Sequence, residues 1–218
     1  MKHLMGTVFD MDGVIVHSNP VHKETIKEFC IKHKQDVSDT FLEERVWGRT
    51  NKEWIPEVFG DISAEECEVL ADEKEQMFRD RFDPKSAVIP GIVFFLEKLR
   101  KQSIPAVVAT SAPGENADFI LSQLNIRDFF SDVLDSSDVD KGKPEPQVYL
   151  KAAERIGLPP SQCIVFEDSL AGVEAGIRAG SKVVGISSTH TPEELSDCAM
   201  VISDFNNLKV DDLKRLIE

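Results

Sequence analysis

Residues 5–14 read MGTVFDMDGV, and the interpretation of the whole chain starts from this stretch. The apolar run Met5–Phe9 is typical of a buried strand, and the polar residues after it end that strand. Two carboxylates, Asp10 and Asp12, therefore stand at the carboxyl end of the first predicted strand. A lone D-x-D pair is a weak signal, since it also occurs in solvated turns and calcium loops. Its meaning depends on what the other strands carry.

Downstream of Asp83-Pro84, short apolar runs alternate with helical patterns. The predicted strands are Ala106–Thr110, Asp132–Leu134, Cys163–Glu167, Lys182–Ile186 and Met200–Ile202. The predicted helices are Gly91–Gln102, Glu115–Leu124, Gln147–Ile156, Leu170–Ala179, one opened by the capping box Thr191–Glu194, and a last one at the end of the chain. Such alternation predicts βαβ units, and hence an α/β fold whose parallel sheet is covered on both faces.

Between these two regions the sequence carries only helical signals. Asn19-Pro20 has the N-cap and first-turn chemistry of a helix start, and Ser63–Glu66 forms a capping box that opens a long charged helix. Gly48 is expected to end a helix that begins near Asp39. We therefore predict a core made of residues 1–16 and 84–218, with an all-helical insert over residues 17–83.

Polar groups follow several of the predicted strands. Thr110-Ser111 ends the second strand, Glu167-Asp168-Ser169 ends a later one, and Lys143-Pro144 lies in a loop before a helix. Taken alone, each has a plainer explanation: a helix cap, first-turn acids beside a helix dipole, or an ordinary loop. In a parallel sheet, however, ligands bind beyond the carboxyl ends of the strands, so these groups are expected to converge with Asp10.

Carboxylates gathered at one edge repel one another unless a cation joins them. A site rich in carboxylates and without His or Cys suits Mg²⁺. The candidate ligands are Asp10, Glu167, Asp168 and Asp12, the last through its backbone carbonyl.

These residue types predict phosphoryl transfer. Asp10 would attack phosphorus and form an aspartyl phosphate, while Asp12 would act as general acid and then as base. The hydroxyl of Thr110, the backbone N–H groups after it at Ser111 and Ala112, and Lys143 would bind the phosphoryl oxygens.

FDMDGV, VVATS, KGKPEP and VFEDS resemble, in order, the four signature motifs of the haloacid dehalogenase superfamily. SNPVH, VWGRT and FEDSLAGVEAGIRAG look like its β-phosphoglucomutase and sugar-phosphatase branch, and the helical insert resembles its C1 cap. The resemblance implies a Rossmann-like three-layer core, Mg²⁺, and a cap that opens and closes over small phosphorylated metabolites. Dehalogenases of the superfamily lack the second aspartate, so Asp12 favours phosphoryl transfer.

The resemblance also bears on the insert. Ser18 and His22 match a Thr and a His that β-phosphoglucomutase uses near its acid/base aspartate, and Lys74 matches that enzyme's cap lysine. The alternatives are an exposed first-turn histidine and a lysine that is solvated or paired along its helix. These residues, with Gly48, Arg49 and Asn51, are the candidate substrate contacts of the insert.

Departures from the mutase favour a phosphatase. Asn51 stands where the mutase has the cap arginine that holds the distal phosphate, although Arg49 is close by in the chain. His17, Asn19 and Ala112–Gly114 also differ from that branch. The expectation is therefore a Mg²⁺-dependent phosphohydrolase, with a sugar-phosphate mutase as the alternative. A binding module on an inactive scaffold is disfavoured because all four motifs are chemically intact.

The composition narrows the partners. A net charge of −14 over 218 residues disfavours nucleic acid and anionic membranes. An anionic small substrate is compatible with this charge if a metal and a few lysines reverse it locally. The expected partner is the small phosphorylated metabolite that the resemblance implies, and the expected state is a monomer. Four cysteines without metal spacing could form two disulfides, but free thiols are favoured. The chain has no signal-peptide pattern and no long apolar run, so a cytoplasmic protein is expected.

Overall fold

The computed structural model describes residues 5–46 and 49–218. They divide into two compact units, which we call the core unit (residues up to His17, and Pro84–Glu218) and the helical unit (Ser18–Asp83). His17 belongs to the core unit, where its backbone N–H donates to the carbonyl of Ala87 at 2.7 Å.

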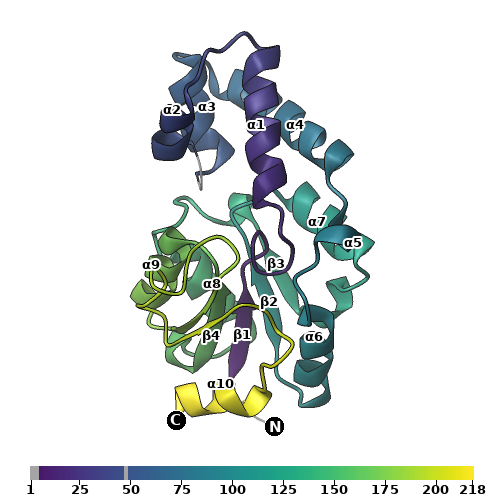
Figure 1. The fold of residues 1–218 in the computed structure, drawn as a ribbon. Helices are drawn as coiled ribbons and strands as arrows, with labels where there is room; N and C mark the ends of the chain where they lie inside the picture. Colours follow the sequence, from purple (N-terminus) through teal and green to yellow (C-terminus); the bar gives the residue numbers. More distant parts are fainter. Residues whose placement is uncertain (1–4, 47–48) are drawn as a thin grey trace. The chain divides into compact units, whose positions relative to one another are not determined.

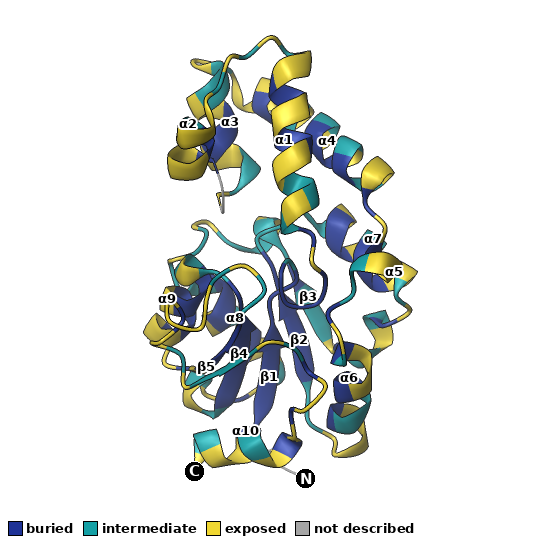
Figure 2. Ribbon diagram, in the orientation of Figure 1, coloured by how far each residue is buried: buried dark blue, intermediate teal, exposed yellow. Residues whose placement is uncertain are grey.

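The core unit is built on one parallel sheet, which confirms the predicted α/β class. Within the described residues it has six strands in the order β3-β2-β1-β4-β5-β6, and every neighbouring pair is parallel. The strands are β1 (Gly6–Phe9), β2 (Ala106–Ala109), β3 (Asp132–Leu134), β4 (Cys163–Glu167), β5 (Lys182–Ile186) and β6 (Met200–Ile202). The central strands are buried along their whole length (Figure 2), as expected for a sheet covered on both faces.

Helices alternate with the strands from β1 to β5 (Figure 1), whereas β6 follows β5 without a helix between them in the described residues. They are α5 (Pro84–Ala87), α6 (Ile92–Lys101), α7 (Gly114–Gln123), α8 (Gln147–Ile156), α9 (Leu170–Arg178) and α10 (Val210–Ile217), with short 3₁₀ turns at Arg127–Phe129, Ser136–Asp138 and Pro160–Gln162. Each predicted helix from Gly91 to Ala179 is present, with ends within one residue of the expected positions.

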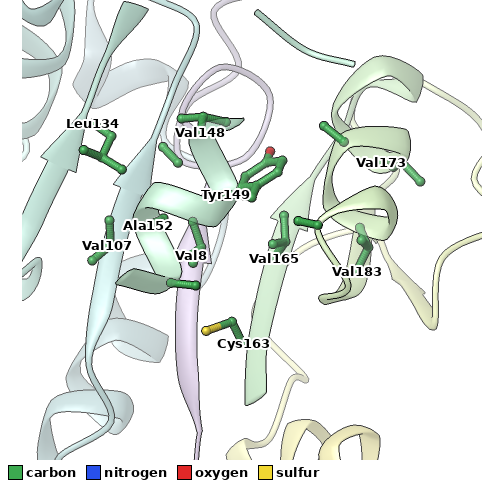
Figure 3. Packing of buried hydrophobic residues seen from close by; sticks show 14 of the residues in the cluster. Val8, Val107, Leu134, Val148, Tyr149, Ala152, Cys163, Val165, Val173 and Val183 are labelled. Atoms are coloured by element: carbon green, nitrogen blue, oxygen red, sulfur yellow. The ribbon is translucent and has the colours of Figure 1, made fainter. Parts of the chain in front are cut away.

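The two faces of the sheet have different packing. On one face, apolar side chains such as Val8 and Val165 meet Tyr149 and Ala152 of α8 and Val173 of α9 (Figure 3). The other face is aromatic. The ring of Phe9 stacks on Phe166 at 4.5 Å, and both rings pack near Phe205, with Phe95 of α6 closing the layer. Successive strand residues point to opposite faces, so Val8 and Phe9 join different layers.

The helical unit contains α1 (Asn19–Lys32), α2 (Asp39–Arg45), α3 (Asn51–Phe59) and α4 (Ala64–Arg81). Its own small core includes Phe29, Leu42, Trp54 and Ile55. The capping box at Ser63 and Glu66 is present as predicted.

Two helix ends in this unit differ from expectation. Ser18, one residue before the predicted Asn19, is the N-cap of α1, since the helix already includes Asn19 before Pro20. The helix that was expected to reach Gly48 ends at Arg45, with the buried Val46 as its C-cap. Gly48 itself lies outside the described residues.

The capping box at Thr191 was expected to open a helix, and this is wrong. The contacts of the box do form, because the backbone N–H of Thr191 donates to the Glu194 carboxylate and the backbone N–H of Glu194 donates to the Thr191 hydroxyl. The chain after them, however, continues in turns. Leu195 is fully buried and the N–H of Ala199 donates to the carbonyl of Val183 at 2.8 Å. The chain must return to β6 within a few residues, so tertiary pairing overrides the local helix signal.

Cys30, Cys67, Cys163 and Cys198 are free thiols. Every helix in the described part of the chain is too short or too polar to span a lipid bilayer.

The aromatic layer generates a stability prediction from two neighbouring residues of α6. Phe95 is fully buried, whereas Phe94 is 56% exposed. Phe95→Ala should lower the free energy of unfolding by about 3–5 kcal/mol, because it leaves a cavity beside Phe166 and Phe205. Phe94→Ala, the matched control, should lower it by less than about 1 kcal/mol. Urea unfolding followed by circular dichroism measures both, and equal losses would contradict the assignment of this layer to the core.

Candidate active site

The register of the sheet brings the predicted site residues to one edge. β1 lies between β2 and β4, with Phe9 opposite both Val108 and Phe166. The backbone N–H of Asp10 donates to the carbonyl of Phe166 at 3.0 Å, so Asp10 leaves the sheet beside the end of β4. Thr110 follows β2 at the same edge. The expectation that strand ends converge is confirmed.

Lys143 joins these strand ends. Its Nζ lies 2.5 Å from Asp10 Oδ1 and 2.6 Å from Glu167 Oε1, and it also donates to the carbonyl of Ala109 at 3.4 Å. The side chains of all three charged residues are less than one-tenth exposed. A lysine from a loop far along the chain therefore pairs with two buried carboxylates at the ends of neighbouring strands, and its single charge compensates only one of them.

Glu167 is the most enclosed group of the site. Its Oε1 accepts from Lys143 and from the hydroxyl of Tyr149, the latter at 2.7 Å. Its Oε2 accepts from the backbone N–H groups of Asp168 and Ser169 at 2.8 and 2.9 Å, and from the Ser169 hydroxyl at 3.0 Å. A Cβ on Gly172 would lie 1.7 Å from Oε1, so only glycine leaves room for this carboxylate. Glu167 thus fixes both Lys143 and the turn that carries Asp168.

The carboxylates titrate very differently. Burial raises the pKa of Asp10 well above its usual range, and repulsion from Glu167, Asp168 and Asp12 adds to this, although Lys143 opposes it. Burial and the charge of Glu167 raise the pKa of Asp168 to about 7. Burial would also raise the pKa of Glu167, but Lys143 and the hydrogen bonds around it hold that pKa below its usual value. The ionised forms of Asp10 and Asp168 are therefore disfavoured unless a further positive charge compensates them.

This set of groups fits a divalent cation. Asp10, Glu167 and Asp168 are all buried and each offers a carboxylate oxygen, with these oxygens within 4.8 Å of one another. A positive ion between them would relieve the repulsion that raises the two pKa values. Hard oxygen donors without nitrogen or sulfur suit Mg²⁺. The ligand role expected for the Asp12 carbonyl stays a prediction.

The loops after β1 and β2 are each held by hydrogen bonds within the loop. Asp12 is half-buried, and the next residue, Gly13, has a φ of +81° and donates its N–H to the carbonyl of Val16 at 2.7 Å. Thr110 is 2% exposed, and its Oγ1 accepts from the N–H of Ala112 at 3.0 Å, which leaves its hydroxyl hydrogen able to donate. Ser111 lies half-buried within that turn.

The loop after β5 also reaches this edge. The hydroxyl of Ser188 donates to the carbonyl of Gly13 at 2.6 Å, and that of Thr189 donates to Asp168 Oδ2. Sequence reasoning missed both residues.

The helical unit holds a second buried cluster of polar groups. Lys74 and Glu75 are 3% and 5% exposed, and Lys74 Nζ lies 2.6 Å from Glu75 Oε1 and 3.4 Å from Nδ1 of His22. Asn51 Nδ2 donates to the same Glu75 oxygen at 2.8 Å, and its Oδ1 accepts from Trp54 at 3.0 Å. The ring of His22 stacks on Phe78 at 3.7 Å. Three predicted substrate contacts, His22, Asn51 and Lys74, are thus brought together.

The other predicted contacts of this unit lie elsewhere. Arg49 is exposed, with its Nη1 3.8 Å from Glu57 Oε1. Ser18 is buried as the N-cap of α1, and its carbonyl accepts from the N–H of His22 at 3.0 Å. Gly48 is outside the described residues.

Two of the residues that were not predicted could have been recognised from the sequence. Tyr149 is the only tyrosine of the chain and shares its helix face with Ala152 and Ala153, so its hydroxyl had to find a buried partner. Thr189 follows a strand of the same sheet, and the rule that flagged Thr110 applies to it equally. Glu75 gives no such signal, because it is one acid among many in a charged helix.

Comparison with known proteins agrees with this geometry. The family model of haloacid dehalogenase-like hydrolases matches residues 5–180. The chain is 28% identical to a validoxylamine A 7′-phosphate phosphatase of Streptomyces hygroscopicus subsp. limoneus, over 93% of this chain and 94% of that one. It is 30% identical to a β-phosphoglucomutase of Bacillus subtilis, over 84% and 83%.

A solved structure extends the likeness to the whole fold. A family IA, variant 3 hydrolase of Entamoeba histolytica superposes with a TM-score of 0.87 at 30% identity, covering 98% of this chain and 99% of that one. The family match spans the strands that end in Asp10, Thr110 and Glu167, and the resemblance noted from their motifs is confirmed. The chain belongs to the haloacid dehalogenase-like hydrolases.

Proposed function

We propose that this chain is a Mg²⁺-dependent phosphohydrolase that acts on a small phosphorylated metabolite through an aspartyl phosphate on Asp10. The observation that carries the proposal is the buried pairing of Lys143 with Asp10 at the sheet edge where Thr110 and Asp168 also lie. The family match and the phosphatase among the relatives support hydrolysis.

The first step transfers the phosphoryl group to the protein. A carboxylate oxygen of Asp10 attacks phosphorus, the bond from phosphorus to the leaving-group oxygen breaks, and Asp12 donates a proton to that oxygen. Lys143 and the hydroxyl of Thr110, with the backbone N–H groups of the loop after it, bind the phosphoryl oxygens where charge develops.

The second step returns the phosphoryl group to water. Asp12, now ionised, accepts a proton from a water molecule whose oxygen attacks phosphorus. The bond from phosphorus to the Asp10 oxygen breaks, inorganic phosphate leaves, and Asp10 is again a carboxylate. Each step breaks one bond to phosphorus and forms one, and no redox change is involved.

Asp10 and Asp168, with the predicted contribution of Asp12 and Glu167, would hold the cation. When bound, Mg²⁺ offsets repulsion between the Asp10 carboxylate and the phosphoryl group. Both oxygens of Glu167 already accept hydrogen bonds from several donors. Glu167 therefore acts mainly by orienting Lys143 and the backbone of Asp168.

The helical unit favours a phosphatase over a mutase. A mutase must hold a second phosphate, for which a bidentate arginine is the natural group. Asn51 is neutral and bonded to Glu75 and Trp54, Lys74 is paired with Glu75, and Arg49 lies nearest Glu57. The mutase remains the second candidate because His22 and Lys74 lie together and because one relative is a β-phosphoglucomutase.

Asp10→Asn should reduce release of inorganic phosphate from an aryl phosphate to trace levels, because an amide does not attack phosphorus. The fold should persist, since the amide keeps the size of the carboxyl group. Asp118→Asn makes the same chemical change on an exposed position of α7 and should leave turnover unchanged. Turnover near the wild-type rate in a folded Asp10→Asn protein would remove Asp10 as nucleophile.

The pKa of about 7 at Asp168 predicts a pH-dependent response to Mg²⁺. In the metal-free protein, a carboxyl whose pKa is raised on folding favours the folded state at low pH. That contribution declines as pH rises from the unfolded value near 4 to about 7. Mg²⁺ requires the ionised form, so it competes with the proton.

The rise in melting temperature on adding Mg²⁺, relative to EDTA, should therefore be larger at pH 8 than at pH 6. Asp168→Asn should shrink the Mg²⁺ effect at both pH values. A shift of the same size at pH 6 and pH 8 in the wild type would show that Asp168 is not a metal ligand.

A coupled assay separates the two candidate functions. With β-glucose 1-phosphate, a catalytic amount of the 1,6-bisphosphate and Mg²⁺, we expect little glucose 6-phosphate, because the neutral Asn51 stands where a mutase would hold the second phosphate with an arginine. Phosphate release is read from the same mixture. Isomerisation far faster than phosphate release would reverse the ranking, and Arg49→Ala should then abolish it.

A further inference from the structure

The loop Ser187–His190, which we call the β5 loop, contacts two elements of the candidate site without belonging to any of the four motifs. Thr189 donates its hydroxyl to Asp168 Oδ2, at the end of β4. Ser188 donates its hydroxyl to the carbonyl of Gly13, in the loop after β1. Two consecutive residues therefore connect the loops that carry Asp12 and Asp168.

Gly13 and Thr189 meet at the same oxygen atom. A Cβ on Gly13 would lie 1.9 Å from Asp168 Oδ2, so this oxygen occupies the space that a side chain at position 13 would fill. Thr189 donates to that oxygen, and Ser188 holds Gly13 by its carbonyl. The carboxylate of Asp168 is 2% exposed and has little freedom to rotate.

We propose that Thr189 is a positioning residue that fixes the orientation of the Asp168 carboxylate and thereby sets the affinity and selectivity of the metal site for Mg²⁺. The inference rests on the proposed function, since it takes Asp168 to be a ligand. Ser188 assists by holding Gly13 against the same oxygen.

Orientation matters more for Mg²⁺ than for Ca²⁺. Mg²⁺ requires near-octahedral oxygens at short distances, whereas Ca²⁺ accepts longer, irregular and two-oxygen carboxylate ligation. When Thr189 holds Oδ2 of Asp168, the carboxylate keeps one orientation, which suits Mg²⁺. A carboxylate that is free to rotate would lose this preference for Mg²⁺ over Ca²⁺. Groups that orient a metal ligand typically contribute 10–100-fold in metal affinity.

The test measures binding of the metal alone, without substrate. Isothermal titration calorimetry at pH 8 gives the dissociation constants for Mg²⁺ and for Ca²⁺. Thr189→Val removes the hydroxyl while keeping the branched shape, and Thr189→Ser keeps the hydroxyl. Ser187→Ala is the matched control, because it removes a hydroxyl from the same loop that bonds instead to the carbonyl of Ile202 at 3.4 Å. A thermal melt in EDTA verifies that each variant folds. If Thr189→Val does not fold, Thr189→Ala takes its place in the comparison.

Thr189→Val should weaken Mg²⁺ binding about tenfold and Ca²⁺ binding clearly less, while Thr189→Ser and Ser187→Ala remain near wild type. Wild-type affinity in Thr189→Val, or equal losses in the valine and serine variants, would overturn the inference. So would an unchanged ratio of the two affinities. In these cases the proposed function stands, because wild type still binds Mg²⁺. Failure of the wild type to bind Mg²⁺ would overturn the metal site and this inference together.

Discussion

Buried charge compensation by Lys143 is the constraint on which the rest of the site depends. Asp10 and Glu167 are carboxylates on adjacent strands, almost without access to water, and Asp168 adds a third beside them. One ammonium group lies within 2.6 Å of the first two. Removing one partner of a buried ion pair typically costs roughly 3–5 kcal/mol, because the other charge is left uncompensated. Loss of the Lys143 ammonium would therefore leave two buried carboxylates without the partner they share.

The surrounding structure serves to keep these charges in place. Glu167 accepts backbone N–H groups from the turn that follows it, and Thr110 closes its own loop through Ala112. Gly13 and Gly172 provide room for carboxylates where any side chain would collide with them. The carboxylates of this edge are therefore fixed by contacts within the protein itself. In the proposed reaction, donors that are already oriented would need no reorganisation when charge develops on the phosphoryl group.

The sequence predicted the parts of this arrangement that depend on local pattern. Asp10, Thr110 and Glu167 each follow a short apolar strand, and the position of strand ends in a parallel sheet does not depend on side-chain detail. Tyr149, Thr189 and Glu75 depend on which side chains meet across the fold, which spacing does not reveal. Thr191 shows the converse, because its capping contacts form but the chain then bonds to β5 and enters β6 without forming a helix. The placement of Gly48 and the roles assigned to the helical unit remain predictions.

The position of β1 in the sheet has a consequence for how the chain folds. β1 is the first strand in the chain but lies near the middle of the sheet, where Thr7 pairs with Ala106 on one side and Ile164 on the other. The whole helical unit is synthesised between β1 and its first partner. Contacts of such long sequence separation form late, whereas the helical unit is closed by contacts within its own segment. On the ribosome, β1 would emerge as an apolar strand with no partner, and the helical unit would be able to fold before the sheet that positions Asp10 exists.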